Sequence, residues 1–208
     1  MRTILCFGDS NTWGWDPVTE ARFCPDVRWP GVLRRELGPE YWVIEEGLPG
    51  RTTVWNDPIE GYKNGKDYLI PCLDSHAPID LVIILLGTND LKMRFSVSAY
   101  DIANSNGVLV DIVQRCMAGP DGQAPKVLLL APPPLGKLTE YAEMLEGASG
   151  KALRFSHHFR RVAEEYACPL LDTADVIASS DIDGIHFEAE EHAKLGRAVA
   201  RRVKELLD

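Results

Sequence analysis

The sequence predicts a single α/β domain whose strands form a parallel sheet. Five short apolar runs alternate with longer amphipathic stretches along the chain, a pattern typical of repeated βαβ units. The third run, 81–86, is apolar without alternation, as expected for a central parallel strand that helices cover on both faces. The apolar content of 45% allows an ordinary core, and 208 residues favour one domain, 1–208, over two.

The elements follow one another in a regular order. The predicted strands are 4–7, 42–45, 81–86, 127–131 and 170–172. The predicted helices are 30–37, 66–75, 98–117, 151–167 and 189–207. The last helix has the clearest pattern, because Leu195, Val199 and Val203 recur at helical spacing.

Three connections are longer than the loops that usually join such elements: 15–29, 47–64 and 132–150. They hold many aromatic and apolar residues, including Trp55 and Tyr62. Apolar surface on loops is typical of a hydrophobic substrate mouth or of a subunit contact. The sequence leaves both interpretations open.

The chain is acidic, with a formal net charge of −9. Nucleic acids and anionic membranes favour a concentrated basic surface, so we expect no such partner. No apolar stretch approaches the roughly 20 residues that span a bilayer, and the first predicted strand begins almost at Met1, which leaves no room for a signal peptide. These features favour a cytoplasmic protein.

The cysteines give no sign of a metal or redox motif. They are odd in number, scattered, and without a C-x-x-C pair. The five are Cys6, Cys24, Cys72, Cys116 and Cys168. We interpret them as reduced thiols that mostly pack in the interior.

Polar residues suited to chemistry follow the predicted strands. Ser10 comes just after the first strand, Gly50 lies in the loop after the second, and Asn89 follows the third. Asp183 and His186 lie after the fifth strand, before the last helix. The carboxyl ends of parallel strands share one edge of a sheet, which is where ligands bind. We therefore expect these residues to converge on one rim.

These residue types are the parts of a serine hydrolase. A serine hydroxyl is a weak nucleophile, so Ser10 needs an adjacent base, and that base needs a group that fixes its tautomer. His186 is the predicted base and Asp183 the residue that orients it, because their three-residue spacing lets both project from one turn. The backbone N–H groups of Ser10 and of the 47–50 loop, with the Asn89 amide, can bind the oxyanion.

Each residue also has a purely structural interpretation. Ser10 can cap a helix, and Asn89 can stabilise a turn. Asp9 is interpreted as a cap or a brace for the first turn, and Asp90 as turn structure. The remaining histidines, which have no partner comparable to Asp183 and are expected at the surface, are His76, His157, His158 and His192.

Four blocks of the sequence, in this order, resemble the SGNH superfamily, also called GDSL-type hydrolases. The blocks are 8–11 (GDSN), 46–50 (EGLPG), 87–90 (GTND) and 183–186 (DGIH). Longer runs are similar to the mycobacterial arylesterase/acyltransferase group and its rhizobial relatives. These runs are 6–15 (CFGDSNTWGW), 25–29 (PDVRW), 45–47 (EEG) with 51–53 (RTT), and 183–187 (DGIHF).

The resemblance implies a flavodoxin-like, three-layer α/β/α sandwich with a five-stranded parallel sheet. It implies a triad of Ser10, His186 and Asp183, and an oxyanion hole formed by Ser10, Gly50 and Asn89. It also implies small acyl esters as substrates, including aryl esters, with no metal and no cofactor. Relatives of this kind also transfer acyl groups to alcohols or peroxide, and they tend to form homo-oligomers.

The predicted substrate pocket combines family positions with residues of the long loops. Its members are Asn11, Trp15, Thr88, Met144, Leu145 and Ile185. Lys92 is equally consistent with a place facing the substrate or in solvent. Asn11 stands where relatives have leucine, which either favours a more polar acyl or sugar group or reflects drift. Pro49 replaces a small residue and has no N–H, so Gly50 must be the donor if that loop donates.

Three functions are therefore compared. The first is a short-chain esterase that forms an acyl-Ser10 intermediate. The second is a carbohydrate acetylesterase that removes acetyl groups from sugars. The third is a non-catalytic flavodoxin-like binding module, which is disfavoured because the first βα turn lacks the Gly-x-Gly-x-x-Gly fingerprint.

Overall fold

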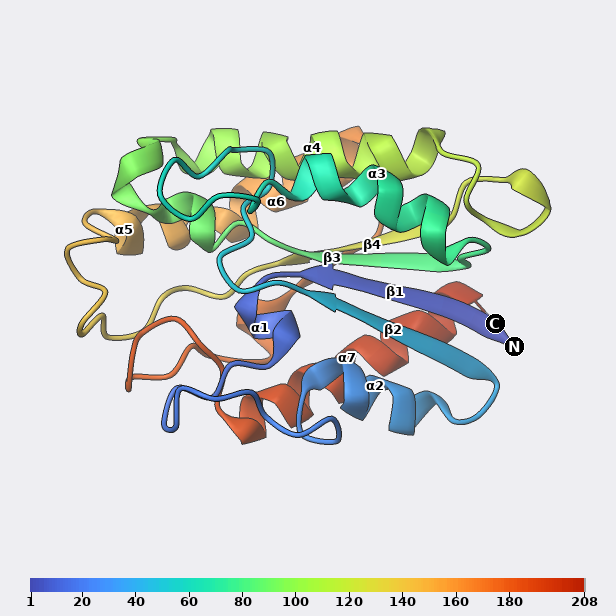
Figure 1. Cartoon of the computed structure of the whole chain (residues 1–208), viewed down its shortest axis with the longest axis horizontal. Coiled ribbons are helices and arrows are strands. Elements are labelled where there is room, and N and C mark those ends of the chain that lie inside the picture. Colours follow the sequence, from blue (N-terminus) through green and yellow to red (C-terminus); the bar gives the residue numbers. More distant parts are fainter. Residues whose placement is uncertain (208) are drawn as a thin grey trace.

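The computed structural model describes residues 1–207, which contain one five-stranded, all-parallel sheet of order β2-β1-β3-β4-β5 (Figure 1). The strands are β1 (Arg2–Gly8), β2 (Tyr41–Gly47), β3 (Leu81–Leu85), β4 (Lys126–Ala131) and β5 (Leu170–Asp172). Each predicted strand is present, and β3 lies in the middle of the sheet as predicted. The α/β fold class is confirmed.

Helices cover both faces of the sheet (Figure 1). One layer holds α2 (Trp29–Leu37) and α7 (Ala189–Leu207). The other layer holds α3 (Gly65–His76), α4 (Ala99–Arg115), α5 (Ala148–Ala152) and α6 (Phe155–Glu165). The helices of residues 1–207 include none that is long and apolar enough to cross a membrane.

The strands are buried on both faces because their side chains alternate between two apolar clusters. In β1, Leu5 and Phe7 pack among the residues beneath α3, α4 and α6, whereas Ile4 and Cys6 pack against α2 and α7. All five residues of β3 are buried. The unbroken apolar pattern of the sequence is therefore explained by the three-layer arrangement.

The predicted helix 151–167 is divided in the structure. α5 ends at Ala152 and α6 begins at Phe155, with a tight turn in which the Arg154 N–H bonds the Lys151 carbonyl. The buried residues Ala152, Phe155 and Phe159 keep helical spacing across this turn. The sequence pattern therefore could not reveal the break.

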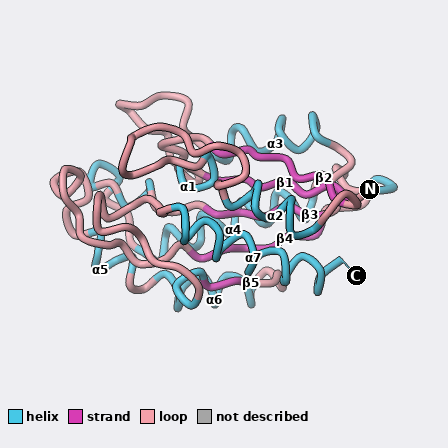
Figure 2. The backbone as a smooth tube through the Cα atoms, turned by 90° about the horizontal axis from the view of Figure 1, so that it is seen from below, coloured by secondary structure: helices cyan, strands magenta, loops and turns pink. Residues whose placement is uncertain are grey.

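The long loops gather at the edge of the sheet where the strands end (Figure 2). The four-residue helix α1 (Ser10–Trp13) also lies there and is too short to produce a helical pattern in the sequence. Gly8 and Gly47, which pair at the ends of β1 and β2, make room for it. A Cβ at Gly8 would lie 2.0 Å from Thr12 Oγ1, and one at Gly47 would lie 2.1 Å from the Trp13 nitrogen.

Four 3-10 turns complete the elements of residues 1–207. They are η1 (Asn89–Leu91), η2 (Met93–Phe95), η3 (Pro120–Gly122) and η4 (Thr173–Asp175). η1 and η2 follow β3, and η4 follows β5. Three of the four therefore contribute to the same loop-rich edge.

Candidate active site

Ser10 is held at the first position of α1. Asp9 caps this helix, with its carboxylate accepting a hydrogen bond from the Asn11 backbone N–H at 2.9 Å. The helix ends at Gly14, whose left-handed backbone (φ 90°) suits glycine. Ser10 is 6% exposed. The interpretation of Asp9 as a cap is confirmed.

Asp183 and His186 lie in a tight turn before α7. The Asp183 Oδ1 atom accepts hydrogen bonds from the backbone N–H groups of Ile185 (2.8 Å) and His186 (2.9 Å). Gly184 has a φ of +81°, and a Cβ added at this position would lie 2.8 Å from the Leu138 backbone nitrogen. The turn therefore needs glycine between the carboxylate and the imidazole.

Ser10, His186 and Asp183 form a continuous chain of hydrogen bonds. His186 Nε2 lies 2.9 Å from Ser10 Oγ, and His186 Nδ1 lies 2.6 Å from Asp183 Oδ2. Burial raises the pKa of Asp183, but hydrogen bonds from the His186 side chain and from two backbone N–H groups lower it below its ordinary value. Asp183 thus stays ionised and can stabilise an imidazolium after His186 accepts the serine proton.

Three candidate oxyanion donors border one cavity of about 190 Å³ that also contains the Ser10–His186 pair. Ser10 and Gly50 contribute from the ends of β1 and β2, and Asn89 from the start of η1 after β3. The Asn89 Nδ2 atom lies 3.4 Å from Asp9 Oδ2, which connects the amide to the turn that carries Ser10. The structure therefore brings together every predicted catalytic and oxyanion residue.

The loop that carries Gly50 is held in place by the buried side chain of Arg51, which is 2% exposed. Its Nη1 atom donates a hydrogen bond of 2.8 Å to the Gly8 carbonyl and a second one to the Glu46 carbonyl. The Leu48 N–H also bonds the Gly8 carbonyl, at 3.1 Å. These contacts fix the Gly50 loop against the strand that carries Ser10.

Three predicted pocket residues line the cavity, namely Trp15, Met144 and Ile185. The Trp15 ring stacks on His186 with centroids 5.4 Å apart. Pro49 and Lys92 also line it, together with Glu60 and Tyr141, which the sequence did not single out. Glu60 and Tyr141 lie in the long loops 47–64 and 132–150. The sequence signal in those loops is their apolar content, which does not point to a charged residue such as Glu60.

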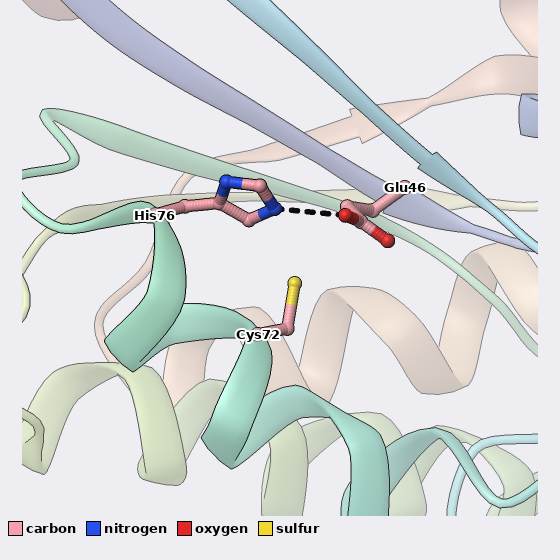
Figure 3. Close-up of side chains that lie close together, drawn as sticks. All are labelled: Glu46, Cys72 and His76. Carbon is pink, nitrogen blue, oxygen red and sulfur yellow. Dashed lines mark hydrogen bonds and ion pairs between the residues drawn. The ribbon is translucent and has the colours of Figure 1, made fainter.

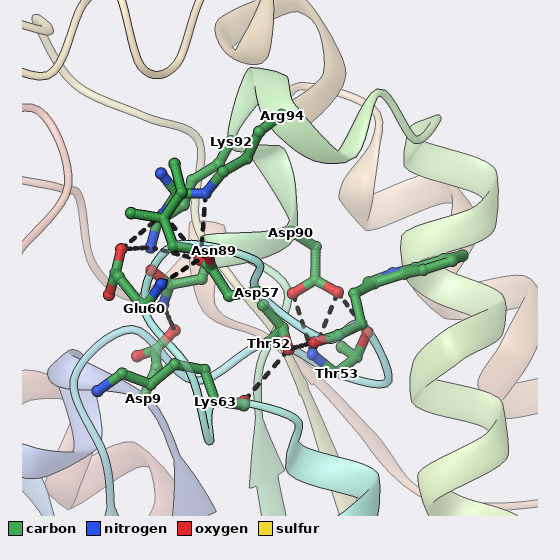
Figure 4. Close-up of polar contacts among 12 residues, drawn as sticks. Asp9, Thr52, Thr53, Asp57, Glu60, Lys63, Asn89, Asp90, Lys92 and Arg94 are labelled. Carbon is green, nitrogen blue, oxygen red and sulfur yellow. Dashed lines mark hydrogen bonds and ion pairs between the residues drawn. The ribbon is translucent and has the colours of Figure 1, made fainter.

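The charged residues on the cavity wall form an ion cluster (Figure 4). Lys92 Nζ lies 2.5 Å from Glu60 Oε1, and Arg94 Nη2 lies 2.6 Å from the same oxygen. Asp57, which is 5% exposed, pairs with Arg94 at 2.7 Å. Lys92 is 4% exposed, so it does not extend into solvent.

The other three predicted pocket residues do not line the cavity. Asn11 is 2% exposed and donates to the Ile185 carbonyl at 3.3 Å, so it connects α1 to the His186 turn. Leu145 is 2% exposed and packs in the core beside Met144. Thr88 is buried just before η1. Adjacent residues point in different directions in a turn, which the sequence could not resolve.

Two buried aspartates lie behind the site. Burial raises the pKa values of Asp9 and Asp90 to about 6. Asp90 accepts hydrogen bonds from the Thr53 backbone N–H at 3.1 Å and from the Thr53 hydroxyl, which ties η1 to the loop after β2 (Figure 4). Asp90 lies in the η1 turn, as predicted, and its carboxylate also links that turn to a distant loop, which was not predicted.

The expectation that His192 lies at the surface is wrong. His192 is 0% exposed, its Nδ1 atom accepts a hydrogen bond from the Trp29 N–H, and Phe23 and Phe187 pack against its ring. Burial lowers the pKa of His192 to about 3. Its position in the first turns of α7 places it against α2, which its neighbours in the sequence do not reveal.

Comparison with known proteins shows the family of the chain. The model of the GDSL-like lipase/acylhydrolase family matches residues 6–194. The chain belongs to this family. It is a carboxylic ester hydrolase of the family, and the resemblance seen in the sequence is confirmed. None of the curated proteins matches the chain.

Solved structures of similar sequence share the whole fold of this family member. An aryl esterase from M. smegmatis is 43% identical, with a TM-score of 0.96 and 100% of each chain covered. A carbohydrate acetylesterase from Sinorhizobium meliloti is 42% identical, with the same TM-score and coverage. A second carbohydrate acetylesterase family member from that organism is 35% identical, with a TM-score of 0.95, covering 100% of this chain and 99% of the other.

Proposed function

We propose that the protein is a serine esterase that hydrolyses short-chain, acetyl-type esters, including aryl esters, through an acyl-Ser10 intermediate. The observation that supports this most directly is the Asp183–His186–Ser10 chain opening into a small cavity bordered by Gly50 and Asn89. The similarity of the protein to an aryl esterase supports this substrate class.

In the first half-reaction, Ser10 Oγ attacks the ester carbonyl while His186 Nε2 accepts the hydroxyl proton. The carbonyl oxygen becomes an oxyanion facing the N–H groups of Ser10 and Gly50 and the Asn89 amide. When the C–O bond breaks, His186 returns the proton to the leaving alkoxide. In the second half-reaction, His186 takes a proton from water and the resulting hydroxide attacks the acyl carbon. When the acyl–Oγ bond breaks, His186 returns the proton to Ser10 Oγ and the carboxylic acid leaves.

The cavity limits the acyl group. Its volume of about 190 Å³ is below the ~300 Å³ at which pockets for drug-sized ligands begin. Trp15, Met144 and Ile185 supply apolar walls, which suits a short alkyl chain. Long fatty acyl chains exceed this volume and would extend out of the cavity.

The test is hydrolysis of p-nitrophenyl esters from acetate to octanoate. We expect the acetate to be cleaved fastest and turnover to fall with chain length. Ser10→Ala and His186→Ala should each lower turnover of every ester by about 10⁴-fold or more. A correctly folded parent enzyme that cleaves none of these esters, or one that prefers octanoate, would contradict the proposal.

A carbohydrate acetylesterase is the second candidate, favoured by the charged part of the cavity wall. Lys92 and Glu60 place an ammonium group and a carboxylate beside the site, where they can bind sugar hydroxyls. Asn11 does not contribute to this, since its amide is engaged with the Ile185 carbonyl. Comparing kcat/KM for aryl acetates, acetylated sugars and acetylated xylan separates the two candidates.

Acyl transfer is a proposed side activity. The acyl-Ser10 ester can react with any nucleophile that enters the site, and the apolar walls favour alcohols over water. Benzyl alcohol should therefore divert part of the acyl group to benzyl acetate. An unchanged yield of acetic acid at every alcohol concentration would rule this activity out. Labelling of Ser10 by a fluorophosphonate would exclude the non-catalytic alternative.

The remaining predictions concern organisation and location. One domain, a cytoplasmic location and the absence of nucleic-acid partners are proposed from composition and pattern. Homo-oligomer formation is proposed from resemblance, and exposed apolar residues support it: Ile59 is 73% exposed and Tyr62 is 102% exposed on the 47–64 loop. Light scattering of the purified protein tests the oligomer directly.

A further inference from the structure

A second cluster of reactive side chains lies between the edge strand β2 and helix α3. Glu46 is the penultimate residue of β2, and Cys72 and His76 lie on α3. The two helical residues are four apart, which places them on the same face of the helix. Figure 3 shows the Cys72 sulfur pointing toward the gap between the His76 imidazole and the Glu46 carboxylate.

The three side chains converge on a common point. His76 Nε2 lies 2.8 Å from Glu46 Oε1, and the three residues each offer one ligand atom within 4.8 Å of the other two. No other group of three or more His, Cys, Asp or Glu residues within 1–207 converges in this way. Cys72 is 1% exposed, whereas the His76 and Glu46 side chains are 29% and 19% exposed. The cluster is therefore closed at the sulfur and open to solvent on its other side.

This donor set suits a transition metal. Imidazole nitrogen, thiolate sulfur and carboxylate oxygen are the three ligand types of zinc sites, with bond lengths of about 2.0–2.3 Å. Tetrahedral binding at those lengths separates neighbouring ligand atoms by about 3.5 Å. The observed separations, 2.8 Å between His76 Nε2 and Glu46 Oε1 and at most 4.8 Å within the cluster, lie on either side of this spacing, so metal binding would require small side-chain rotations. The open side would leave the fourth position to water.

The surroundings orient the ligands. The Tyr68 hydroxyl donates to Glu46 Oε2 at 3.1 Å, which leaves Oε1 facing the cluster. Burial and the Glu46 charge raise the pKa of Cys72 to about 12, while Arg51 opposes this rise. A bound metal displaces the thiol proton outright, so binding releases a proton.

We propose that Glu46, Cys72 and His76 bind one divalent transition-metal ion of the zinc class, which joins β2 to α3. The ion would stabilise the folded chain, since the unfolded chain does not hold the three ligands together. The alternative is that Glu46 and His76 form only an ion pair and that Cys72 only packs.

Cobalt(II) binding tests the proposal, because a thiolate ligand produces an intense charge-transfer band in the near ultraviolet. The parent protein should carry Cys24→Ser, because Cys24 is exposed and can bind metals on its own. We expect one equivalent of Co²⁺ to produce the band and Zn²⁺ to displace it. Cys72→Ser should abolish the band, and the matched control Cys168→Ser, at a buried thiol elsewhere, should retain it.

A second variant avoids changing a buried residue. His76→Gln should weaken Zn²⁺ binding at least tenfold in a calorimetric titration, whereas His157→Gln should leave it unchanged. Zn²⁺ should also raise the melting temperature of the parent but not that of His76→Gln. The proposal is overturned if the parent shows no band with stoichiometric Co²⁺, if Cys72→Ser retains it, or if His76→Gln binds Zn²⁺ as tightly as the parent.

Discussion

The protein contains two clusters in which a carboxylate pairs with a histidine beside a hydroxyl or thiol. In one, Asp183 bonds His186 Nδ1 at 2.6 Å while Ser10 bonds the opposite ring nitrogen. In the other, Glu46 bonds His76 Nε2 at 2.8 Å. In the first cluster the His186 imidazole lies between its two partners and uses both ring nitrogens. In the second cluster Glu46, Cys72 and His76 converge on one point, and Glu46 is bonded to His76 Nε2.

This difference in geometry decides the chemistry. An imidazole placed between a carboxylate and a hydroxyl can move a proton, because one nitrogen is held while the other accepts. Three donors that face a common point can instead share an ion. Burial differs as well, since the side chains of the Asp183–His186 pair are 6% and 9% exposed and those of the Glu46–His76 pair are 19% and 29% exposed. Similar residues thus support a base in one place and a candidate metal site in the other.

The largest expected effect is on kcat, and it distinguishes His186 from His76. Ser10→Ala and His186→Ala should each lower kcat by about 10⁴-fold or more, because the triad acts as a unit. His76→Ala should lose far less, since the His76 ring contacts no serine hydroxyl in residues 1–207. Initial rates with p-nitrophenyl acetate measure this, with His157→Ala as the control. Equal losses in His186→Ala and His76→Ala would remove the distinction between the clusters.

The next largest effect concerns Asn89, the side-chain donor proposed for the oxyanion. The three residues of the Glu46 cluster include no such amide donor. Asn89→Ala should lower kcat by about 10²–10³-fold and change KM little, because the amide acts on charge that develops in the transition state. Asn56→Ala, at an exposed asparagine outside the cavity, is the matched control. A change confined to KM would show that Asn89 binds substrate without stabilising the oxyanion.

A smaller effect is expected from the aromatic ring that covers His186. Trp15 stacks on the imidazole and lines the cavity, and contacts of this kind contribute about 0.5–1.5 kcal/mol. Trp15→Ala should therefore lower kcat/KM by about 2- to 13-fold. Steady-state kinetics with short esters measure it, and Trp42→Ala, at a half-exposed ring on β2, is the control. An unaltered kcat/KM would mean that the stacking does not support catalysis.

The smallest effect is on stability and depends on pH. The pKa of Asp183 is lower in the folded chain than the ordinary value for aspartate of about 3.9, so ionised Asp183 stabilises the fold above that pH. This contribution is lost as the pH falls through the lowered pKa. The difference in unfolding free energy between the parent and Asp183→Asn should therefore narrow from about pH 6 to about pH 3. Urea unfolding at several pH values measures it, and a gap that widens toward low pH would contradict the lowered pKa.

Much of the fold could be predicted because it depends on local pattern. The apolar runs of the five strands and the helical spacing in α7 are visible in the sequence, since a parallel sheet buries both faces of its strands. The break between α5 and α6 was missed, since the buried residues keep the same spacing across it. α1 was missed because four residues are too few to show a period.

The sequence by itself determined which residues meet at the catalytic rim. Ser10, Asn89 and His186 follow different strands, and a parallel sheet brings the carboxyl ends of its strands to one edge. Only the tertiary structure decided which side chains face the cavity: Met144 lines it and Leu145 is in the core, although they are neighbours. Only the structure brought Glu46 beside Cys72 and His76. Side-chain direction in loops and contacts between a strand and a later helix depend on packing, which no local pattern records.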